Sequence, residues 1–475
     1  MEEFDVVILG AGSAGYVSAI RAADLGKKVL IVEGRDIGGT CLNRGCIPTK
    51  AILRAAEVYA EAKESKVFGV DSTCSTFNIG GIQNWKETVV KRLVSGVDFL
   101  LKSRKVVVIR GTGKLVDGNV IEVETATGKE TYKGTDVIIA TGSEPAMIPD
   151  FKIDHNLILT SDDALNLKKV PKDILIVGAG AIGVEFGTFF SEVGSKVTIV
   201  EMMPQVIPTL CFQKKKPCVD ARIAAMAQRI LTKKGMTIKT GVKIVNIEAK
   251  GGKVFSTLDN GEVIETENVL VSIGRKLNSD GIGLEKVGIA TDRSRIIVDE
   301  YLRTNIPHHY AIGDVVGGML LAHKAMKEGE VAAEIIAGND IKMDYRVVPW
   351  AIFTTPEIAA VGISEEEAKA QGIEVVTGEF PFSANGKAIS MNSTDGVVRI
   401  IGTKETHEII GAQIIGPDAS VMIAELALAE QKHLTLEDVA HTIHTHPTVA
   451  ESTMEAAKVP LGEVIHIAQS IRNQN

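Results

Sequence analysis

The sequence predicts an α/β protein in which one βαβ unit occurs twice and an α+β domain follows. Residues 4–9 and 174–177 are short apolar runs, as expected of buried parallel strands, and each leads directly into a glycine-rich turn and a helical pattern. Each copy ends on a glutamate, and in both copies 23 positions separate the first glycine from that glutamate. From about residue 347, short β segments mix with helices and no such turn recurs. These observations indicate two Rossmann-like domains and a separate C-terminal domain.

Composition and charge narrow the class of protein. The chain has 475 residues, of which 45% are hydrophobic, 46 are glycine and only 4% are aromatic, and its net charge is −8. This length predicts about three domains of about 150 residues each, and the negative charge makes nucleic acid a poor partner. No apolar run reaches the roughly 18 residues of a membrane span, and the first strand starts too close to Met1 for a targeting segment. We therefore expect a cytoplasmic protein without a membrane or nucleic-acid partner.

The first copy carries the complete pattern that is typical of a dinucleotide site. Gly10 makes the turn after the strand, Gly12 lets the backbone approach a pyrophosphate at the helix N-terminus, and Gly15 permits close helix–strand packing. Glu33, at the end of the second strand, can accept hydrogen bonds from a ribose. The order of strand, turn, helix, strand and acid makes the pattern more specific than the glycines alone.

The second copy repeats the pattern with Gly178, Gly180, Gly183 and Glu201. No arginine follows Glu201, and its charge would repel a 2′-phosphate, so this site should prefer NAD to NADP. Glu185 lies just inside the helix, where it is either an ordinary N-terminal acid or a residue that faces the reacting rings. Two complete patterns predict either two bound dinucleotides or one fold repeated in the chain.

Two cysteines follow the first pattern closely. The total of five cysteines does not suit a secreted disulfide framework, and no nearby Cys or His cluster supplies the further ligands of a metal site. Cys41 and Cys46 are therefore candidates for a disulfide that opens and closes, although two unrelated buried thiols would show the same spacing. In a regular helix they would lie too far apart to bridge, and Gly45 would let the backbone bring them together. Lys50 would lie near such a centre, unless it is an ordinary surface lysine.

The rest of the chain predicts the surroundings of these patterns. Residues 51–62 and 83–102 have helical periodicity, and the second helix has four apolar residues spaced for one buried face, Trp85, Val89, Leu93 and Val97. Residues 105–140 and 237–273 are typical of β-meanders. We expect a first nucleotide domain over 1–145, a second over 146–275, a return to the first over 276–346 and an interface domain over 347–475.

A histidine motif lies in the last third of the C-terminal domain. Glu451, five residues after His446, could fix one tautomer of the imidazole and raise its basicity, which gives an oriented acid–base pair. His444 and His446 could instead bind a metal or lie on the surface, but no third ligand is evident and we assign no metal. Thiol chemistry near neutral pH needs a base, because the thiolate is the nucleophile, and this favours a place for His446 near the cysteines.

Together, these residues resemble the flavin-dependent pyridine nucleotide–disulfide oxidoreductases over nearly the whole chain. The segments that carry the resemblance are residues 10–15, 38–50, 140–143, 178–183, 313–314, 321–325 and 444–448, with Glu451. The resemblance implies FAD at the first pattern, NAD at the second and a homodimer formed through the C-terminal domain. It also implies, as partner, a lipoyl-bearing protein of a 2-oxo acid dehydrogenase or glycine cleavage complex.

The resemblance implies a role for each matching residue. Cys41 would exchange with a substrate dithiol and Cys46 would face the flavin, while His446, oriented by Glu451, would take the thiol proton from across the dimer. Lys50 would lie by the flavin and pair with Glu185. The implied cofactor-binding residues are Gly10, Gly12, Gly15, Glu33, Lys50, Gly142, Asp314 and Ala322 for FAD, and Gly178, Gly180, Gly183, Glu185, Glu201 and Gly274 for NAD.

The chain departs from the family pattern in two places. Residues 211–219 look like an insertion, and Leu277 replaces a proline that is common in the family. Among rival assignments, a glutathione-type reductase would prefer NADPH, which Glu201 disfavours, and a mercuric reductase would carry a cysteine pair that residues 471–475 lack. A redox-silent subunit of a complex would have no use for the two cysteines and the histidine motif.

Overall fold

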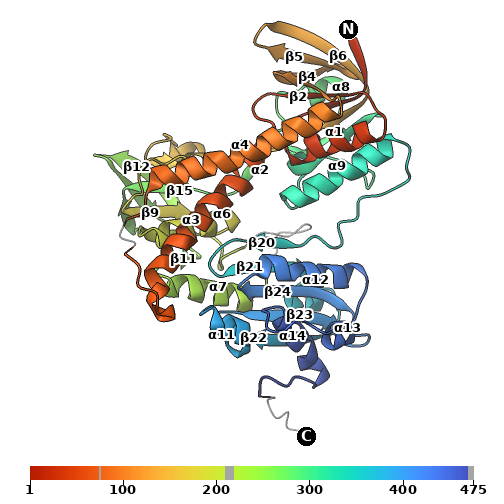
Figure 1. The fold of residues 1–475 in the computed structure, drawn as a ribbon. Helices are drawn as coiled ribbons and strands as arrows, with labels where there is room; N and C mark the ends of the chain where they lie inside the picture. The colour runs from red at the N-terminus through yellow and green to blue at the C-terminus, as the bar shows by residue number, and fades with distance from the viewer. Residues whose placement is uncertain (74–75, 209–218, 469–475) are drawn as a thin grey trace. The chain divides into compact units, whose positions relative to one another are not determined.

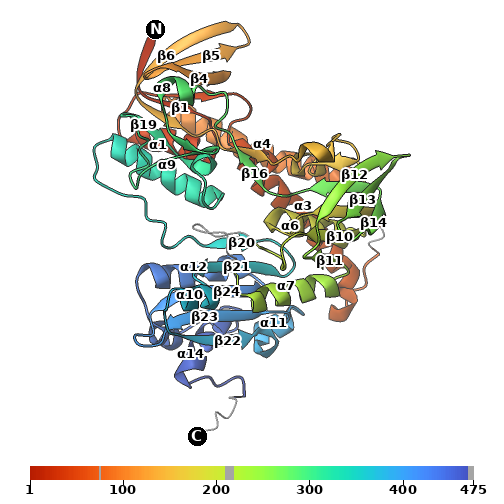
Figure 2. The ribbon, with the colours of Figure 1, turned by 180° about the vertical axis from the view of Figure 1, so that it is seen from behind.

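The computed structural model describes residues 1–73, 76–208 and 219–468, which form two compact units. Unit 1 comprises Met1–Val170 and Leu270–Asp344, and unit 2 comprises Pro171–Val269 and Tyr345–Asn475. Figures 1 and 2 show the elements of each unit from two sides. The two glycine-rich patterns therefore lie in different units, and the predicted insertion at 211–219 falls almost entirely outside the described residues.

A seven-stranded sheet forms the centre of unit 1, with the order β3-β2-β1-β6-β5-β4 and with β19 paired to β6. Its parallel part contains β1 (Glu2–Leu9), β2 (Val29–Glu33), β3 (Val107–Arg110), the last part of β6 (Gly128–Ile139) and β19 (His309–Ala311). β4 (Thr112–Asp117) and β5 (Val120–Thr125) add antiparallel strands to the first part of β6. The predicted meander is therefore shorter than expected, because β3 pairs with β2 and extends the parallel sheet.

The helices of unit 1 include α1 (Ser13–Asp24), α2 (Gly39–Arg44), α3 (Cys46–Glu64), α4 (Ile79–Ser103) and α9 (Ala322–Ile336). The predicted buried face of α4 is wrong for Trp85 and Leu93, which are 54% and 40% exposed, although Val97 is buried. A different side of α4 is covered: Lys86 is buried, and its Nζ donates to Leu165 O at 2.9 Å. Helical periodicity showed which residues share a face of α4, but it did not show which face is covered.

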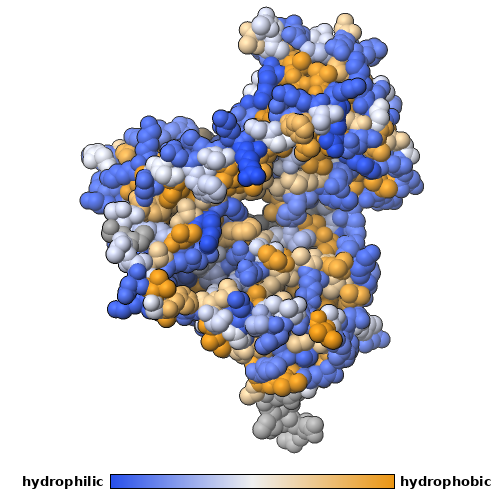
Figure 3. Space-filling model, viewed as in Figure 1, coloured by the Kyte–Doolittle hydropathy of each residue, from blue (hydrophilic) through white to orange (hydrophobic). Residues whose placement is uncertain are grey.

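Figure 3 shows scattered apolar patches on a mostly hydrophilic surface.

Unit 2 contains the second Rossmann-like sheet, in which β11, β10, β9 and β15 are neighbours in that order. These strands are β9 (Asp173–Val177), β10 (Lys196–Glu201), β11 (Thr237–Thr240) and β15 (Asn268–Val271), with helices α6 (Ala181–Glu192) and α7 (Ala221–Lys233). The second meander consists of β12 (Ile244–Lys250), β13 (Lys253–Leu258) and β14 (Val263–Thr266). It too is shorter than predicted, because β11 pairs in parallel with β10.

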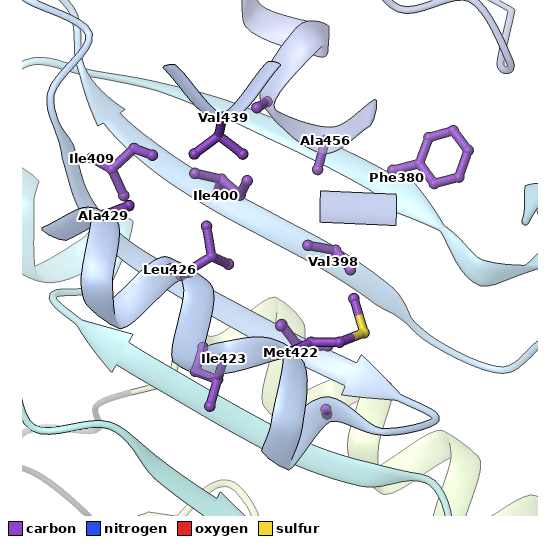
Figure 4. Packing of buried hydrophobic residues seen from close by; sticks show 14 of the residues in the cluster. Phe380, Val398, Ile400, Ile409, Met422, Ile423, Leu426, Ala429, Val439 and Ala456 are labelled. Carbon is purple, nitrogen blue, oxygen red and sulfur yellow. The ribbon is translucent and has the colours of Figure 1, made fainter. Parts of the chain in front are cut away.

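The C-terminal part of unit 2 is an α+β domain around a five-stranded antiparallel sheet of order β20-β21-β24-β23-β22. The strands are β20 (Trp350–Ile352), β21 (Glu357–Gly362), β22 (Val375–Pro381), β23 (Val397–Thr403) and β24 (Ile409–Gly416). Helices α12 (Ala419–Gln431), α13 (Leu436–His441) and α14 (Glu451–Leu461) contribute to its core, in which Leu426 lies near Ile400 and Met422 lies near Val398 (Figure 4). Within the described ranges, no helix is both long enough and apolar enough to cross a membrane.

Candidate active site

The two glycine-rich turns have nearly the same backbone geometry. Gly10 has φ +102° and Gly178 has φ +103°, and their N–H groups donate to Val32 O and Val200 O, both at 2.8 Å. A side chain at Gly10 would place its Cβ only 2.4 Å from Ala140 O. Glycine is required here both by the left-handed backbone and by the close approach of the neighbouring strand. The βαβ repeat predicted from spacing is thus present in both units.

Each turn leads into a helix whose N-terminus is open to a ligand. Gly12 and Gly180 are the N-caps of α1 and α6, and neither helix has a side-chain cap or an acidic residue in its first turn. A Cβ on Gly180 would meet no atom within 4 Å, and one on Gly12 would meet only Gly39 Cα, at 4.0 Å. N–H groups without intrahelical partners, a positive helix end and open space suit an anionic pyrophosphate. Both sites therefore fit a dinucleotide.

The two strand-ending glutamates also hold the turns in place. Glu33 Oε2 accepts the Ala11 N–H at 2.6 Å, and Glu201 Oε2 accepts the equivalent Ala179 N–H at 2.8 Å. The other Glu201 oxygen accepts the Met203 N–H at 2.8 Å. Each carboxylate therefore braces its own turn, a role that the sequence pattern did not reveal.

The segment that carries Cys41 and Cys46 consists of two helices that meet at Gly45. α2 ends at Arg44 and α3 begins at Cys46, and a Cβ on Gly45 would lie 2.9 Å from Thr40 O. Cys41 is partly buried and Cys46 is exposed, and a hydrogen bond joins their side chains. The break between the helices brings together two sulfur atoms that one continuous helix would hold apart.

Three neighbours act on the Cys41 thiol. The hydrogen bond with Cys46, followed by burial and the Cys46 charge, raises the pKa of Cys41, whereas the hydrogen bond with Ser13 and the charge of Lys50 lower it by less. Burial raises the pKa of Tyr16, and the charge of Cys41 adds to this shift. A thiol with a raised pKa needs a base to become a nucleophile. Ser13 and Tyr16 were not predicted, and their only sequence signal is their place after the glycine-rich turn.

Asp314 lies on a short 3-10 helix, η3 (Gly313–Val316), and is held by two other residues. The Ser143 hydroxyl donates to Asp314 Oδ2. Arg275 in turn donates from Nε to Ser143 Oγ and from Nη2 to Ser143 O, both at 2.7 Å. Arg275 Nε also lies 4.0 Å from Asp314 Oδ2. Sequence reasoning did not identify Arg275 as a site residue, because a single arginine after a strand carries no distinctive signal.

The remaining predicted residues of unit 1 lie before strands or in the first turns of helices. Gly142 and Gly274 have φ +72° and +125° and directly precede β7 (Ser143–Pro145) and β16 (Arg275–Leu277), which pair with each other. Gly274, predicted at the NAD site, thus belongs to unit 1. Ala322 is the first residue of α9, a helix without a side-chain cap or an acidic residue in its first turn. Gly15 packs so closely that a Cβ would lie 1.9 Å from Gly10 O.

His446 and Glu451 form a hydrogen-bonded pair in unit 2. His446 Nδ1 lies 2.9 Å from Glu451 Oε1, the other Glu451 oxygen accepts the Thr448 N–H at 2.9 Å, and the imidazole is 79% exposed. Burial acts to raise the pKa of Glu451, but the hydrogen bonds from Thr448 and His446 outweigh it and lower that pKa. An ionised carboxylate only accepts hydrogen bonds, so Nδ1 carries the proton and Nε2 is available to take another.

His444 has partners of its own and does not share them with His446. Its Nδ1 lies 2.9 Å from Thr442 O, and its Nε2 lies 2.9 Å from Glu425 Oε1. Both ring nitrogens therefore face acceptors, and the hydrogen bond with Glu425 raises the pKa of His444 despite partial burial. No group of three or more metal-ligating side chains occurs in the part of the chain that the structure describes.

Two predicted pairings involve residues from different units. Glu185 is 6% exposed on α6, and its Oε1 accepts the Phe353 N–H at 3.0 Å within unit 2. Lys50 lies on α3 of unit 1, as do the cysteines. The pairing of Lys50 with Glu185 and the approach of His446 to Cys41 stay predictions.

Comparison with known proteins relates this geometry to a family. Residues 4–329 match the family model of pyridine nucleotide-disulphide oxidoreductases, and residues 348–457 match the dimerisation domain of the same family. The chain belongs to the pyridine nucleotide-disulphide oxidoreductase family. Its fold class is confirmed, it is an oxidoreductase with FAD and NAD as cofactors, and the matched dimerisation domain supports a homodimer.

Individual relatives cover almost the whole chain. The dihydrolipoyl dehydrogenase of Geobacillus stearothermophilus is 46% identical over 469 residues, with 98% of each chain covered. The mitochondrial dihydrolipoyl dehydrogenase of Pisum sativum is 41% identical and covers 98% of this chain and 93% of its own. Among solved structures, LpdA from Mycobacterium tuberculosis has a TM-score of 0.88 at 28% identity, covering 96% of this chain and 99% of its own. The HOCl-induced flavoprotein disulfide reductase RclA from Escherichia coli has a TM-score of 0.85 at 27% identity, with the same coverage.

Proposed function

We propose that this chain is a dihydrolipoyl dehydrogenase, which oxidises protein-bound dihydrolipoamide and reduces NAD⁺ to NADH. The observation that carries the proposal is the hydrogen-bonded Cys41–Cys46 pair, in which Cys41 also interacts with Ser13 and Tyr16, the residues that follow the first glycine-rich turn. A thiol pair beside a dinucleotide turn suits the exchange of electrons between a dithiol and a nucleotide cofactor. Relatives of 41% to 46% identity over 98% of the chain support the same activity.

The exchange begins with the pair as a disulfide. A substrate thiolate attacks Cys41 Sγ, and Cys46 leaves as a thiolate; the second substrate thiol then displaces Cys41 and closes the lipoyl disulfide. The substrate loses two electrons and its thiol protons, and the protein disulfide becomes a dithiol. His446 takes a thiol proton at Nε2, because its Nδ1 faces Glu451. FAD, when bound, carries the two electrons from the dithiol to NAD⁺.

The cofactor contacts are part of the same proposal. The turn and acid of unit 1, with Lys50, Gly142, Asp314 and Ala322, hold FAD. The turn and acid of unit 2, with Glu185 and Gly274, hold NAD, and Lys50 pairs with Glu185. Glu201 disfavours NADP, since its carboxylate would repel a 2′-phosphate. The partner is a lipoyl-bearing protein of a 2-oxo acid dehydrogenase or glycine cleavage complex, and the site of action is the cytoplasm.

Steady-state rates with alternative substrates, measured in parallel, test the proposal. We expect yellow protein that turns over dihydrolipoamide with NAD⁺, much less with NADP⁺, and that does not reduce glutathione disulfide. Equal use of NADP⁺ would contradict the role of Glu201. Turnover of glutathione disulfide in place of lipoamide would favour the rival disulfide reductase, and a folded but colourless protein would favour a redox-silent subunit.

A further inference from the structure

α9 carries a buried ion pair that the reaction does not use. Lys324 and Glu328 lie one helical turn apart, their side chains are 0% exposed, and Lys324 Nζ lies 3.0 Å from Glu328 Oε1. Taking two charges out of water costs free energy that their mutual attraction often does not recover, so apolar side chains of similar volume would serve stability at least as well. The pair therefore requires an explanation other than stability.

Both charged groups bind the backbone around η3, the short helix that presents Asp314. Glu328 Oε2 accepts the Gly313 N–H at 2.7 Å. Lys324 Nζ donates to Gly317 O at 3.2 Å and approaches Gly313 O at 3.4 Å. Gly313 begins η3 and has φ +79°, and Gly317 follows it and has φ +74°. At these two positions the backbone therefore lacks the regular hydrogen bonds of a helix or a sheet. The ion pair supplies the contacts that fix both ends of the turn.

The helix that carries the pair is itself fixed to the first glycine-rich turn. α1 and α9 lie side by side (Figures 1 and 2). A Cβ on Gly329 of α9 would lie 2.5 Å from Ala14 O and 3.1 Å from Ser18 N. A Cβ on Gly313 would also lie 3.2 Å from Ala14 Cβ. Close backbone contact thus connects the N-terminal part of α1 with α9, and the ion pair connects α9 with η3.

We propose that Lys324 and Glu328 are positioning residues for FAD. They hold Asp314, through the backbone of η3, at a fixed place relative to the open N-terminus of α1. The inference rests on the proposed function, in which Asp314 binds FAD. It assigns to this buried pair an effect on FAD affinity that is separate from its effect on the stability of the fold.

Two double variants separate these effects. Lys324→Met with Glu328→Leu removes both charges at similar volume but leaves the Gly313 N–H and the Gly317 carbonyl without side-chain partners. The apoprotein should therefore melt at a lower temperature, and the folded apoprotein should bind FAD about tenfold more weakly, as for one lost buried hydrogen bond. Lys324→Met with Glu328→Gln keeps an amide oxygen for the Gly313 N–H and should recover most of the affinity. FAD titration of apoprotein, followed by flavin fluorescence, measures affinity, and calorimetry measures melting.

The matched control is a pair on the same helix. Lys327 and Glu330 also lie 3.0 Å apart, but their side chains are 61% and 48% exposed. Lys327→Met with Glu330→Gln should leave FAD affinity unchanged. Wild-type affinity in the Met–Leu double variant, beside weakened affinity in Asp314→Ala, would overturn the inference and leave the proposed function intact. Wild-type affinity in Asp314→Ala would instead refute the assignment of Asp314, and the inference with it.

Glu328→Gln alone carries the test if the Met–Leu variant does not fold. The change is isosteric, but Glu328 uses separate oxygens for Lys324 and Gly313, so the amide must turn its NH2 group toward one of these two donors. We expect weakened FAD binding that the added Lys324→Met restores, since the amide oxygen then serves Gly313 alone. A merely structural pair would not show this rescue, and unchanged affinity in Glu328→Gln would contradict the inference.

Discussion

His446 shows how one side chain can set the proton position of another. The Glu451 carboxylate, with its pKa lowered by hydrogen bonds that outweigh burial, accepts from Nδ1. The opposite nitrogen is then available to take a proton, which in the proposed reaction comes from the substrate thiol. The proposed role of His446 thus depends on its hydrogen bond with Glu451 as well as on the imidazole itself.

Replacement of His446 by Gln should slow the dithiol half-reaction by about 10²-fold or more, because a general base is lost. Rapid-mixing measurement of flavin reduction by dihydrolipoamide reads this step. Flavin reduction by NADH serves as the internal control and should keep its rate. An unchanged dithiol rate would show that His446 takes no part in the reaction.

Glu430 on α12 predicts a pH-dependent stability. Burial raises the pKa of Glu430 from 4.5 to about 8. The charge of Arg346 opposes this shift, and the charge of Glu408 adds to it. The native protein thus holds a proton that the unfolded chain releases, so the stabilising contribution is complete below about pH 4.5 and is lost as the pH rises through about 8.

Glu430→Gln removes this titration. Its melting temperature should exceed that of the wild type by an amount that grows between pH 5 and pH 9, as calorimetry or circular dichroism would record. Glu330→Gln, at an exposed carboxylate, should show no such trend. A difference that shrinks with rising pH would contradict the raised pKa.

At the scale of elements, the redox centre depends on the break between α2 and α3. Gly45→Ala would place a Cβ 2.9 Å from Thr40 O and 3.2 Å from Thr40 Cγ2, and must push the two helices apart. We expect fewer disulfide-linked molecules after oxidation, by thiol titration, and slower lipoamide turnover. Gly96→Ala on α4 is the control, because its Cβ would meet no atom within 4 Å and alanine favours a helix. Equal effects of the two changes would refute this account.

The two glycine-rich turns should respond differently to the same change. Gly12→Ala and Gly180→Ala each add a methyl group to the open space at a helix N-terminus. The first should weaken FAD binding and yield protein with little flavin absorbance, whereas the second should stay yellow and raise the KM for NAD⁺. Loss of flavin from the second variant and not the first would reverse the assignment of the two sites.

At the scale of the whole molecule, the proposed catalytic groups are divided between two units of the chain. The cysteines belong to unit 1, and His446 belongs to unit 2 together with the dimerisation domain. In the proposed mechanism, a homodimer combines cysteines from one copy with a histidine from the other, which would make each active site dependent on assembly.

A mixing experiment tests this division. Cys46→Ser and His446→Gln homodimers should each be inactive, but co-refolded mixtures contain hybrid dimers in which one copy supplies intact cysteines and the other supplies His446. If the histidine acts across the dimer, lipoamide activity should return to about a quarter of the wild-type value, since half of the dimers are hybrids with one complete site. Absence of any recovery would place His446 beside the cysteines of its own copy.

The sequence by itself determined the two βαβ repeats and the break at the cysteines. These features are local, because only glycine readily adopts a left-handed turn and allows a close backbone approach. Gly10 and Gly178 can therefore be recognised from the sequence alone. The spacing from glycine to acid carries the same information, because a βαβ unit has a set length.

Only the tertiary structure decided which side chains are covered. Lys86 and Lys324 are buried, whereas Trp85, which was predicted to lie on a buried face, is exposed. Ser143 meets Arg275 and Asp314 although 132 and 171 positions separate it from them in the chain. Helical and strand periods say which residues share a face, but burial and long-range hydrogen bonds depend on the elements that pack against that face, and no local pattern records these.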